Sequence, residues 1–179
     1  REFCLFYYTS ASICSCGTSD MADISRRQFL RGDFSGKKVV LRPPWARAQA
    51  AFVAACTRCC DCINVCPQHI LMLDKDARPM VDFGRGECTF CGKCVEACRP
   101  QALEKREGEP PWGLRAQIQS SCLAKSNVVC RACGDACPER AIRFSPKVMS
   151  AAQPEVDNAL CTGCGACYAP CPAQAIRIA

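Results

Sequence analysis

Residues 56–67 read CTRCCDCINVCP, in which five cysteines fall within twelve residues and a proline ends the run. Cysteines this dense are joined as disulfides, bind zinc, or bind iron together with sulfide. These possibilities differ in redox compartment, in fold and in chemistry. The spacing of the cysteines along the whole chain decides between them.

The cysteine pattern of this stretch occurs four times. The spacing is C-x2-C-x2-C-x3-C, except that the first gap of the third copy is seven residues. The second copy maps onto the fourth at a constant offset of 73 residues (88 to 161 and 98 to 171), which indicates duplication of a two-motif unit. The four motifs are Cys56, Cys59, Cys62 and Cys66; Cys88, Cys91, Cys94 and Cys98; Cys122, Cys130, Cys133 and Cys137; and Cys161, Cys164, Cys167 and Cys171.

Iron–sulfur binding accounts for this repeat best. Disulfides require an oxidising compartment and give no reason for gaps of two, two and three residues. Zinc sites favour two C-x2-C pairs separated by a longer loop, whereas here three cysteines share one short loop. The spacing with a following proline is the one that holds [4Fe–4S] clusters in bacterial proteins. We therefore expect four [4Fe–4S] clusters as cofactors.

Composition agrees with a fold that depends on its cofactors. The apolar content of 49% includes 20 cysteines, so few aliphatic side chains remain for a core. The formal charge of +6 counts thiols as neutral, but four clusters with their thiolates would add about −8 and leave about −2. The charge therefore gives no reason to expect nucleic-acid binding. No apolar run approaches the length of a transmembrane helix, so none is expected.

The order of motifs and short apolar runs predicts an α+β fold. Short strands are expected at 70–74, 79–83, 102–107, 114–119, 141–145 and 175–179, alternating with single-turn helices at the motifs. We expect two tandem modules similar to bacterial ferredoxins, at residues 55–109 and 110–179, each with two clusters.

In two-cluster bacterial ferredoxins the fourth cysteine of each motif binds the cluster of the other motif. This cross-over rule predicts four ligand sets. They are Cys56, Cys59, Cys62 and Cys98 for cluster 1; Cys88, Cys91, Cys94 and Cys66 for cluster 2; Cys122, Cys130, Cys133 and Cys171 for cluster 3; and Cys161, Cys164, Cys167 and Cys137 for cluster 4.

Some cysteines and the single histidine fit the repeat less well. Cys122 is separated by the seven-residue gap; it is a ligand on a longer loop or a bystander, and we favour the ligand. Cys60 is expected to be a free thiol that faces away from its cluster, because only Cys59 keeps both two-residue gaps. His69, which we compare with the alanines of the other motifs, is expected to be a surface or packing residue.

Residues 21–54 contain no cysteine and form a basic N-terminal arm. SRRQFL at 25–30 matches the twin-arginine export pattern, but no apolar segment of the required length follows, so the protein is expected to stay in the cytoplasm. The arm is either a solvated leader or a docking segment for a partner through Arg26, Arg27 and Arg31. Residues 1–20 lack the repeat signals, and we expect Met21 to be the natural start, with an unusual natural extension as the alternative.

The four motifs, together with RRQFLRG at 26–32 and RPPWA at 42–46, resemble the NapF family, the ferredoxin-type accessory proteins of the periplasmic nitrate reductase operon. The resemblance implies a cytoplasmic iron–sulfur protein that binds the catalytic subunit of periplasmic nitrate reductase before its export and helps it to mature. The alternative is an electron-transfer subunit of another oxidoreductase. Because no nucleophile or acid–base pair stands out, we expect no enzymatic activity of its own.

Overall fold

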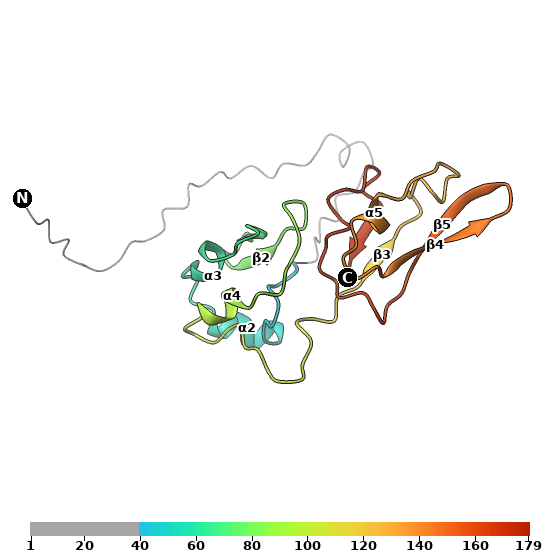
Figure 1. The fold of residues 1–179 in the computed structure, drawn as a ribbon. Coiled ribbons are helices and arrows are strands. Elements are labelled where there is room, and N and C mark those ends of the chain that lie inside the picture. The colour runs from blue at the N-terminus through green and yellow to red at the C-terminus, as the bar shows by residue number, and fades with distance from the viewer. Residues whose placement is uncertain (1–39) are drawn as a thin grey trace, which may run out of the picture. The chain divides into compact units, whose positions relative to one another are not determined.

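A computed structural model describes residues 40–179 of the chain (Figure 1). The proposed boundary at residue 20 and the docking residues Arg26, Arg27 and Arg31 lie outside the described residues. In the described part, short helices and two-stranded antiparallel sheets alternate along the chain. The elements fall into two halves, each with two cysteine motifs.

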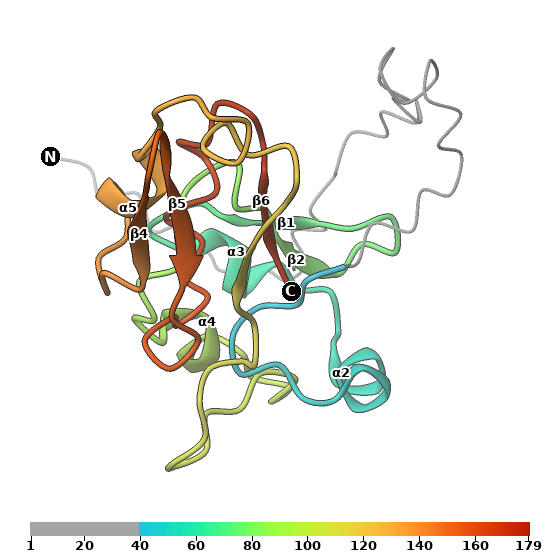
Figure 2. The same ribbon diagram turned by 90° about the vertical axis from the view of Figure 1, so that its right-hand side faces the viewer.

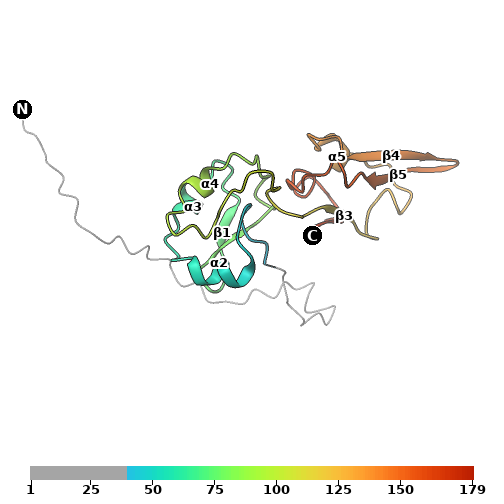
Figure 3. The same cartoon turned by 90° about the horizontal axis from the view of Figure 1, so that it is seen from below.

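The first half is built around a hairpin and two single-turn helices. Strand β1 (Leu71–Leu73) pairs with β2 (Pro79–Val81), with Leu71 opposite Val81. Helix α3 (Asp61–Asn64) carries the third cysteine of motif one, and α4 (Lys93–Glu96) carries that of motif two. The two helices pack against each other, as Figure 3 shows.

The ends of the first half pair with each other. Ala46 and Leu103 form an antiparallel bridge, flanked by hydrogen bonds from the Arg47 N–H to the Ala102 oxygen and from the Glu104 N–H to the Trp45 oxygen. The strand expected at 102–107 is reduced to this single bridge. The bridge nevertheless closes the first half, because it joins a segment before its first motif to one after its second.

The second half repeats this plan with longer strands. Strand β4 (Ile142–Lys147) pairs with β5 (Ser150–Val156) in the hairpin of Figure 2, beside α5 (Ala132–Asp135). Strand β3 (Ala116–Ile118) pairs with β6 (Ile176–Ile178) and takes the place of the terminal bridge. The fourth motif, unlike the other three, has turns at 166–170 instead of a helix.

Residues 40–54 are folded, which corrects the expectation of an arm that extends to residue 54. Trp45 is 7% exposed, and Phe52, on helix α2 (Gln49–Ala55), is fully buried. Apolar burial outweighs the basic character of this segment, because its two aromatic side chains pack into the first half and the Arg42 guanidinium lies over the Phe52 ring. The boundary expected at residue 55 therefore falls inside a folded unit.

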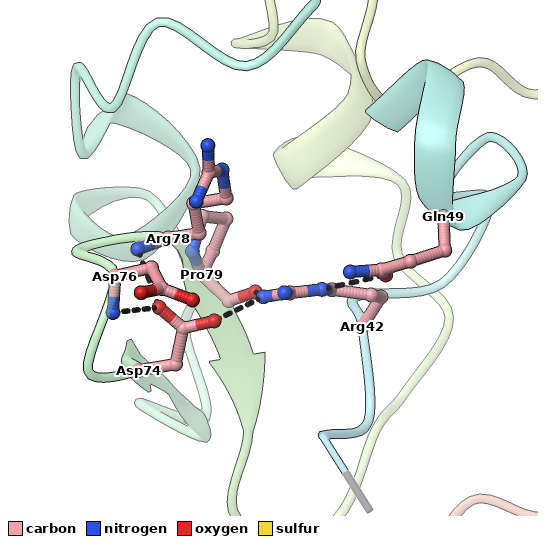
Figure 4. Close-up of polar contacts among 6 residues, drawn as sticks. All are labelled: Arg42, Gln49, Asp74, Asp76, Arg78 and Pro79. Atoms are coloured by element: carbon pink, nitrogen blue, oxygen red, sulfur yellow. Dashed lines mark hydrogen bonds and ion pairs between the residues drawn. The ribbon is translucent and has the colours of Figure 1, made fainter. Parts of the chain in front are cut away.

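Arg42 attaches this segment to the hairpin (Figure 4). Its guanidinium pairs with the Asp74 carboxylate at 2.7 Å and donates to the Pro79 oxygen at 3.1 Å. Its Nε donates to the Gln49 side chain at 3.1 Å, and the guanidinium carbon lies 5.0 Å from the ring centre of Phe52. One arginine therefore connects α2 with the β1–β2 turn.

Asp74 also organises the turn itself. Its carboxylate accepts the N–H groups of Asp76 and Arg78, each at 2.9 Å. Burial would raise the pKa of Asp74, but the hydrogen bonds from Arg78, Arg42 and Asp76 outweigh it and hold the pKa below its usual value. The carboxylate is therefore charged in the folded protein at neutral pH.

Candidate iron–sulfur centres

The sixteen motif cysteines lie around four small cavities, four at each, and Cys60 also lines one of them. We call the cavities first to fourth, after the motif that supplies most of the thiols. The first is lined by Cys56, Cys59, Cys62 and Cys98; the second by Cys66, Cys88, Cys91 and Cys94; the third by Cys122, Cys130, Cys133 and Cys171; and the fourth by Cys137, Cys161, Cys164 and Cys167. These groups coincide with the four sets that the cross-over rule gives.

The fourth cysteine of each motif reaches the neighbouring cavity because it lies beyond the short helix or turn. Cys62 on α3 lines the first cavity, and Cys66, after the end of that helix, lines the second. In the same way, Cys98 of the second motif follows the end of α4 and lines the first cavity. In the first half, each motif thus contributes one cysteine to the cavity of the other motif.

The donor set suits a cluster of several metal atoms better than one ion. Among residues 40–179, no three His, Cys, Asp or Glu side chains are grouped as a single metal ion requires. Instead, four thiols surround a hollow, as the four iron corners of a cube require. The residues therefore fit [4Fe–4S] clusters by the chemistry and placement of their donors.

The loops wind around the cavities through left-handed backbone positions. Each of the first, second and fourth motifs has two such positions, before and after its second cysteine: Arg58 and Cys60, Phe90 and Gly92, and Gly163 and Gly165. A non-glycine residue in this conformation costs roughly 1–2 kcal/mol. Three of these six positions are not glycine, so bonds to a bound group are expected to offset much of the cost of the loops.

The residue three places after each fourth cysteine is also left-handed. These residues are His69, Gln101, Arg140 and Gln174, and the N–H of each donates to the carbonyl of that cysteine at 3.0–3.1 Å. This corrects the comparison of His69 with alanines: the alanines match Ile70, the next residue, and all four of those side chains are buried. His69 is an exposed turn residue.

Backbone N–H groups point at several ligand sulfurs. Cys137 accepts from Ala141 at 3.4 Å and Cys171 from Ala175 at 3.2 Å. Cys98 accepts from Leu103 at 3.4 Å, one residue further along than in the other two, and its proline is also one residue later. Such bonds stabilise thiolates and tune the reduction potential of a bound cluster.

Burial raises the pKa of several of the cysteine thiols that line the cavities. It is the main reason that the pKa of Cys62, Cys94 and Cys167 rises to about 12, and the like charge of neighbouring thiolates adds to it. Burial likewise raises the pKa of Cys88 and Cys133 to about 11. Because a metal binds the thiolate, cluster binding must release these protons.

The third cavity is built differently from the others. Cys122 comes from a turn between β3 and α5, is only 9% exposed, and lies with the thiols of Cys130 and Cys133. Arg131 lacks the left-handed conformation found at this position in the other motifs, with a φ of −129°. Because of the seven-residue gap, the Cys122 thiol reaches the third cavity from a separate turn.

Cys60 lies beside the first cavity as well. Its thiol donates to the Arg58 carbonyl oxygen at 3.6 Å, within the left-handed part of the loop. It lines the same cavity as Cys59, which differs from the expectation that it faces away. Its side chain therefore belongs to the wall of the site, while the spacing still favours Cys59 as the ligand.

Protein-family models identify the class of protein to which this chain belongs. Residues 55–103 and 128–175 each match a 4Fe-4S dicluster domain. The chain is thus a ferredoxin-type iron–sulfur protein with two tandem dicluster domains, and its role is in electron transfer or as an accessory protein. Helices long and apolar enough to span a membrane are absent from residues 40–179.

The family follows from individual relatives. The chain is 41% identical to "Ferredoxin-type protein NapF" of Escherichia coli K12 over 154 residues, which are 86% of this chain and 93% of that protein. It is 44% identical to the protein of the same name from Haemophilus influenzae, over 87% of this chain and 94% of the relative. The chain belongs to the NapF family of ferredoxin-type proteins.

Two further ferredoxin-type proteins match this chain at lower identity. "Methylamine utilization ferredoxin-type protein MauM" of Methylobacillus flagellatus is 33% identical over 87% of this chain and 74% of its own length. "Ferredoxin-type protein NapG" of Haemophilus influenzae is 33% identical over 74% of this chain and 55% of its own length.

Proposed function

We propose that this protein holds four [4Fe–4S] clusters and acts in the cytoplasm as an accessory protein to the catalytic subunit of periplasmic nitrate reductase. It binds that subunit before export and helps it to mature, by electron transfer or by cluster assembly. The observation that carries the iron–sulfur part is the set of four cavities, each lined by four thiols. Family membership, with RRQFLRG at 26–32, supports the choice of partner.

The residues of this chain contribute binding, shielding and tuning. Four thiolates hold each cluster, and the N–H groups of Leu103, Ala141 and Ala175 donate to ligand sulfurs. Buried side chains such as Phe52 and Ile70 keep water away from the walls of the cavities. When bound, each cluster supplies one-electron oxidation and reduction. This machinery moves electrons and needs no acid–base pair.

The alternative function is electron transfer for a different oxidoreductase. The likeness to a ferredoxin-type protein of methylamine utilization favours it, because a protein of similar sequence is named there for a different metabolic process. In that case residues 21–39 would serve only as a tether, and the two-cluster halves would make the contacts with the partner.

Capture of the nitrate reductase catalytic subunit distinguishes the two functions. The anaerobically purified protein, tagged at its C-terminus, should retain the unexported subunit from a cytoplasmic extract. A triple variant with Arg26→Gln, Arg27→Gln and Arg31→Gln should lose most of this binding. Its matched control replaces three exposed arginines of the folded part, Arg85, Arg106 and Arg143, by glutamine and should bind normally.

Binding of only the exported, mature enzyme would contradict a role in maturation. Equal binding by the two triple variants would contradict docking through the basic segment. Both variants should keep their iron, since neither removes a thiol.

A further inference from the structure

The cysteine loops of the second and fourth cavities touch each other directly. The Cys88 N–H donates to the Cys164 carbonyl oxygen at 2.8 Å. Cys88 lines the second cavity and Cys164 the fourth, and the two residues come from different halves of the chain. A single hydrogen bond thus connects two cluster-binding loops.

Aromatic side chains surround this contact. The Trp112 indole N–H donates to the Thr162 carbonyl oxygen at 2.9 Å, and Thr162 lies in the loop of the fourth motif. The Trp112 ring lies 5.5 Å from that of Phe90, in the loop of the second motif, and 5.9 Å from that of Phe83. Phe83, 4% exposed, lies 6.5 Å from the ring of Tyr168. Trp112 therefore bridges the two loops.

The junction leaves no room for additional atoms. A Cβ on Gly165 would lie 2.0 Å from the Phe83 ring, and a Cβ on Gly163 would lie 2.4 Å from the Leu114 oxygen. Both glycines belong to the loop of the fourth motif, so this loop is packed tightly against side chains and backbone outside the motif. Buried residues of both halves form one continuous cluster, in which Phe83 and Ile142 are members.

Within each half, the exchange of the fourth cysteine defines which cavities are neighbours. Cys62 and Cys66 lie four residues apart and line the first and second cavities. Cys133 and Cys137 have the same separation and line the third and fourth. The contact between Cys88 and Cys164 adds a neighbouring pair that joins the halves.

We propose that the loop contact between Cys88 and Cys164, packed by Phe83 and Trp112, is the electron-transfer junction between the two halves, so that the cavities conduct in the order first, second, fourth, third. The second and fourth cavities are the inner positions, and the first and third are the terminal ones. The inference rests on the proposed binding of four clusters. In each step one electron leaves a reduced cluster and enters an oxidised neighbour, with no bond made or broken. A low-potential one-electron donor starts the sequence.

Two pairs of cysteine variants test this order. Cys59→Ala with Cys130→Ala removes one thiol from each terminal cavity and leaves the inner cavities complete. Cys91→Ala with Cys164→Ala does the reverse and leaves only the terminal cavities complete. Each full-length protein is loaded anaerobically, analysed for iron, reduced with dithionite, and examined by EPR for magnetic interaction between its remaining clusters.

The inner pair should show a spin–spin interaction that the terminal pair lacks. Equal spectra from the two pairs, or interaction only in the terminal pair, would overturn the order. A wild-type protein that binds no iron would instead overturn the proposed function, and this separates the two failures.

A third variant tests the junction without removing any ligand. Phe83→Ala with Trp112→Ala, in the chain with all its cysteines, should keep the full iron content but lose the part of the magnetic interaction that arises between the halves. Val148→Ala with Met149→Ala removes two exposed side chains of the second half that line none of the four cavities, and should leave that interaction as in the wild type. An unchanged spectrum of the double variant at full iron content would refute the junction.

Discussion

Replacement of Arg42 by methionine leaves the Asp74 carboxylate without its charged partner in a buried position. The side chains of Arg42 and Asp74 are only 11% and 4% exposed, and their closest atoms are 2.7 Å apart. Loss of one partner from a buried pair costs about 3–5 kcal/mol, because the remaining charge stays desolvated. Methionine preserves most of the apolar stem that contacts Phe52, so the loss measures mainly the guanidinium.

The matched control is Arg106→Met. Arg106 pairs with Glu104 at 3.2 Å, but the two side chains are 56% and 37% exposed. Pairs of this kind contribute about 0–1 kcal/mol. The control therefore makes the same chemical change at an exposed position, where water solvates the carboxylate that loses its partner.

Anaerobic urea unfolding of the cluster-loaded proteins, followed by circular dichroism and by visible absorbance, gives the comparison. With a slope of about 2 kcal/mol per molar urea, the Arg42→Met midpoint should fall by about 1.5–2.5 M and that of the control by less than about 0.5 M. Equal shifts in the two variants would refute the argument that residues 40–54 are held to the first half by a buried ion pair.

Three further predictions concern single positions. Cys122→Ser should lower the iron content by about a quarter and remove one cluster signal from the EPR spectrum. Cys60→Ser should retain the full iron content. Equal losses of iron in the two variants would show that the ligand roles of these cysteines are wrong. Asp74→Asn should destabilise the protein at neutral pH. Because the pKa of Asp74 is lowered on folding, the difference from wild type should stay constant above about pH 4 and shrink as the pH falls through the folded pKa; a difference that grows with acidity in urea titrations would contradict this. Gly165→Ala should lower the midpoint of thermal unfolding, because the added methyl group would clash with the Phe83 ring. A midpoint equal to that of the wild type would show that the packing around Phe83 accommodates the methyl group.

The sequence alone predicts most of the site. Thiol spacing is a local property, and the exchange of the fourth cysteine follows from the helical turn between Cys62 and Cys66. The two strands expected after the first motif, at 70–74 and 79–83, correspond to the β1–β2 hairpin. These features depend on neighbours close in the chain, which a sequence pattern records well.

Features that depend on distant residues were harder to predict. The packing of residues 40–54 against the first half is not evident from the sequence, because Trp45 and Phe52 are buried in a segment whose composition is basic. Strand β5 is not among the expected strands, although PEVD at 154–157 repeats PMVD at 79–82 and indicates it. The contact between Cys88 and Cys164 has no counterpart within either motif, so only the folded arrangement reveals it.

Iron and acid-labile sulfide per chain, measured on protein purified without oxygen and combined with EPR after reduction, test the central claim most directly. Four cavities with four thiols each predict about sixteen iron and sixteen sulfide, together with the signals of reduced [4Fe–4S] clusters. A colourless protein that contains zinc, or whose cysteines are oxidised to disulfides, would contradict it.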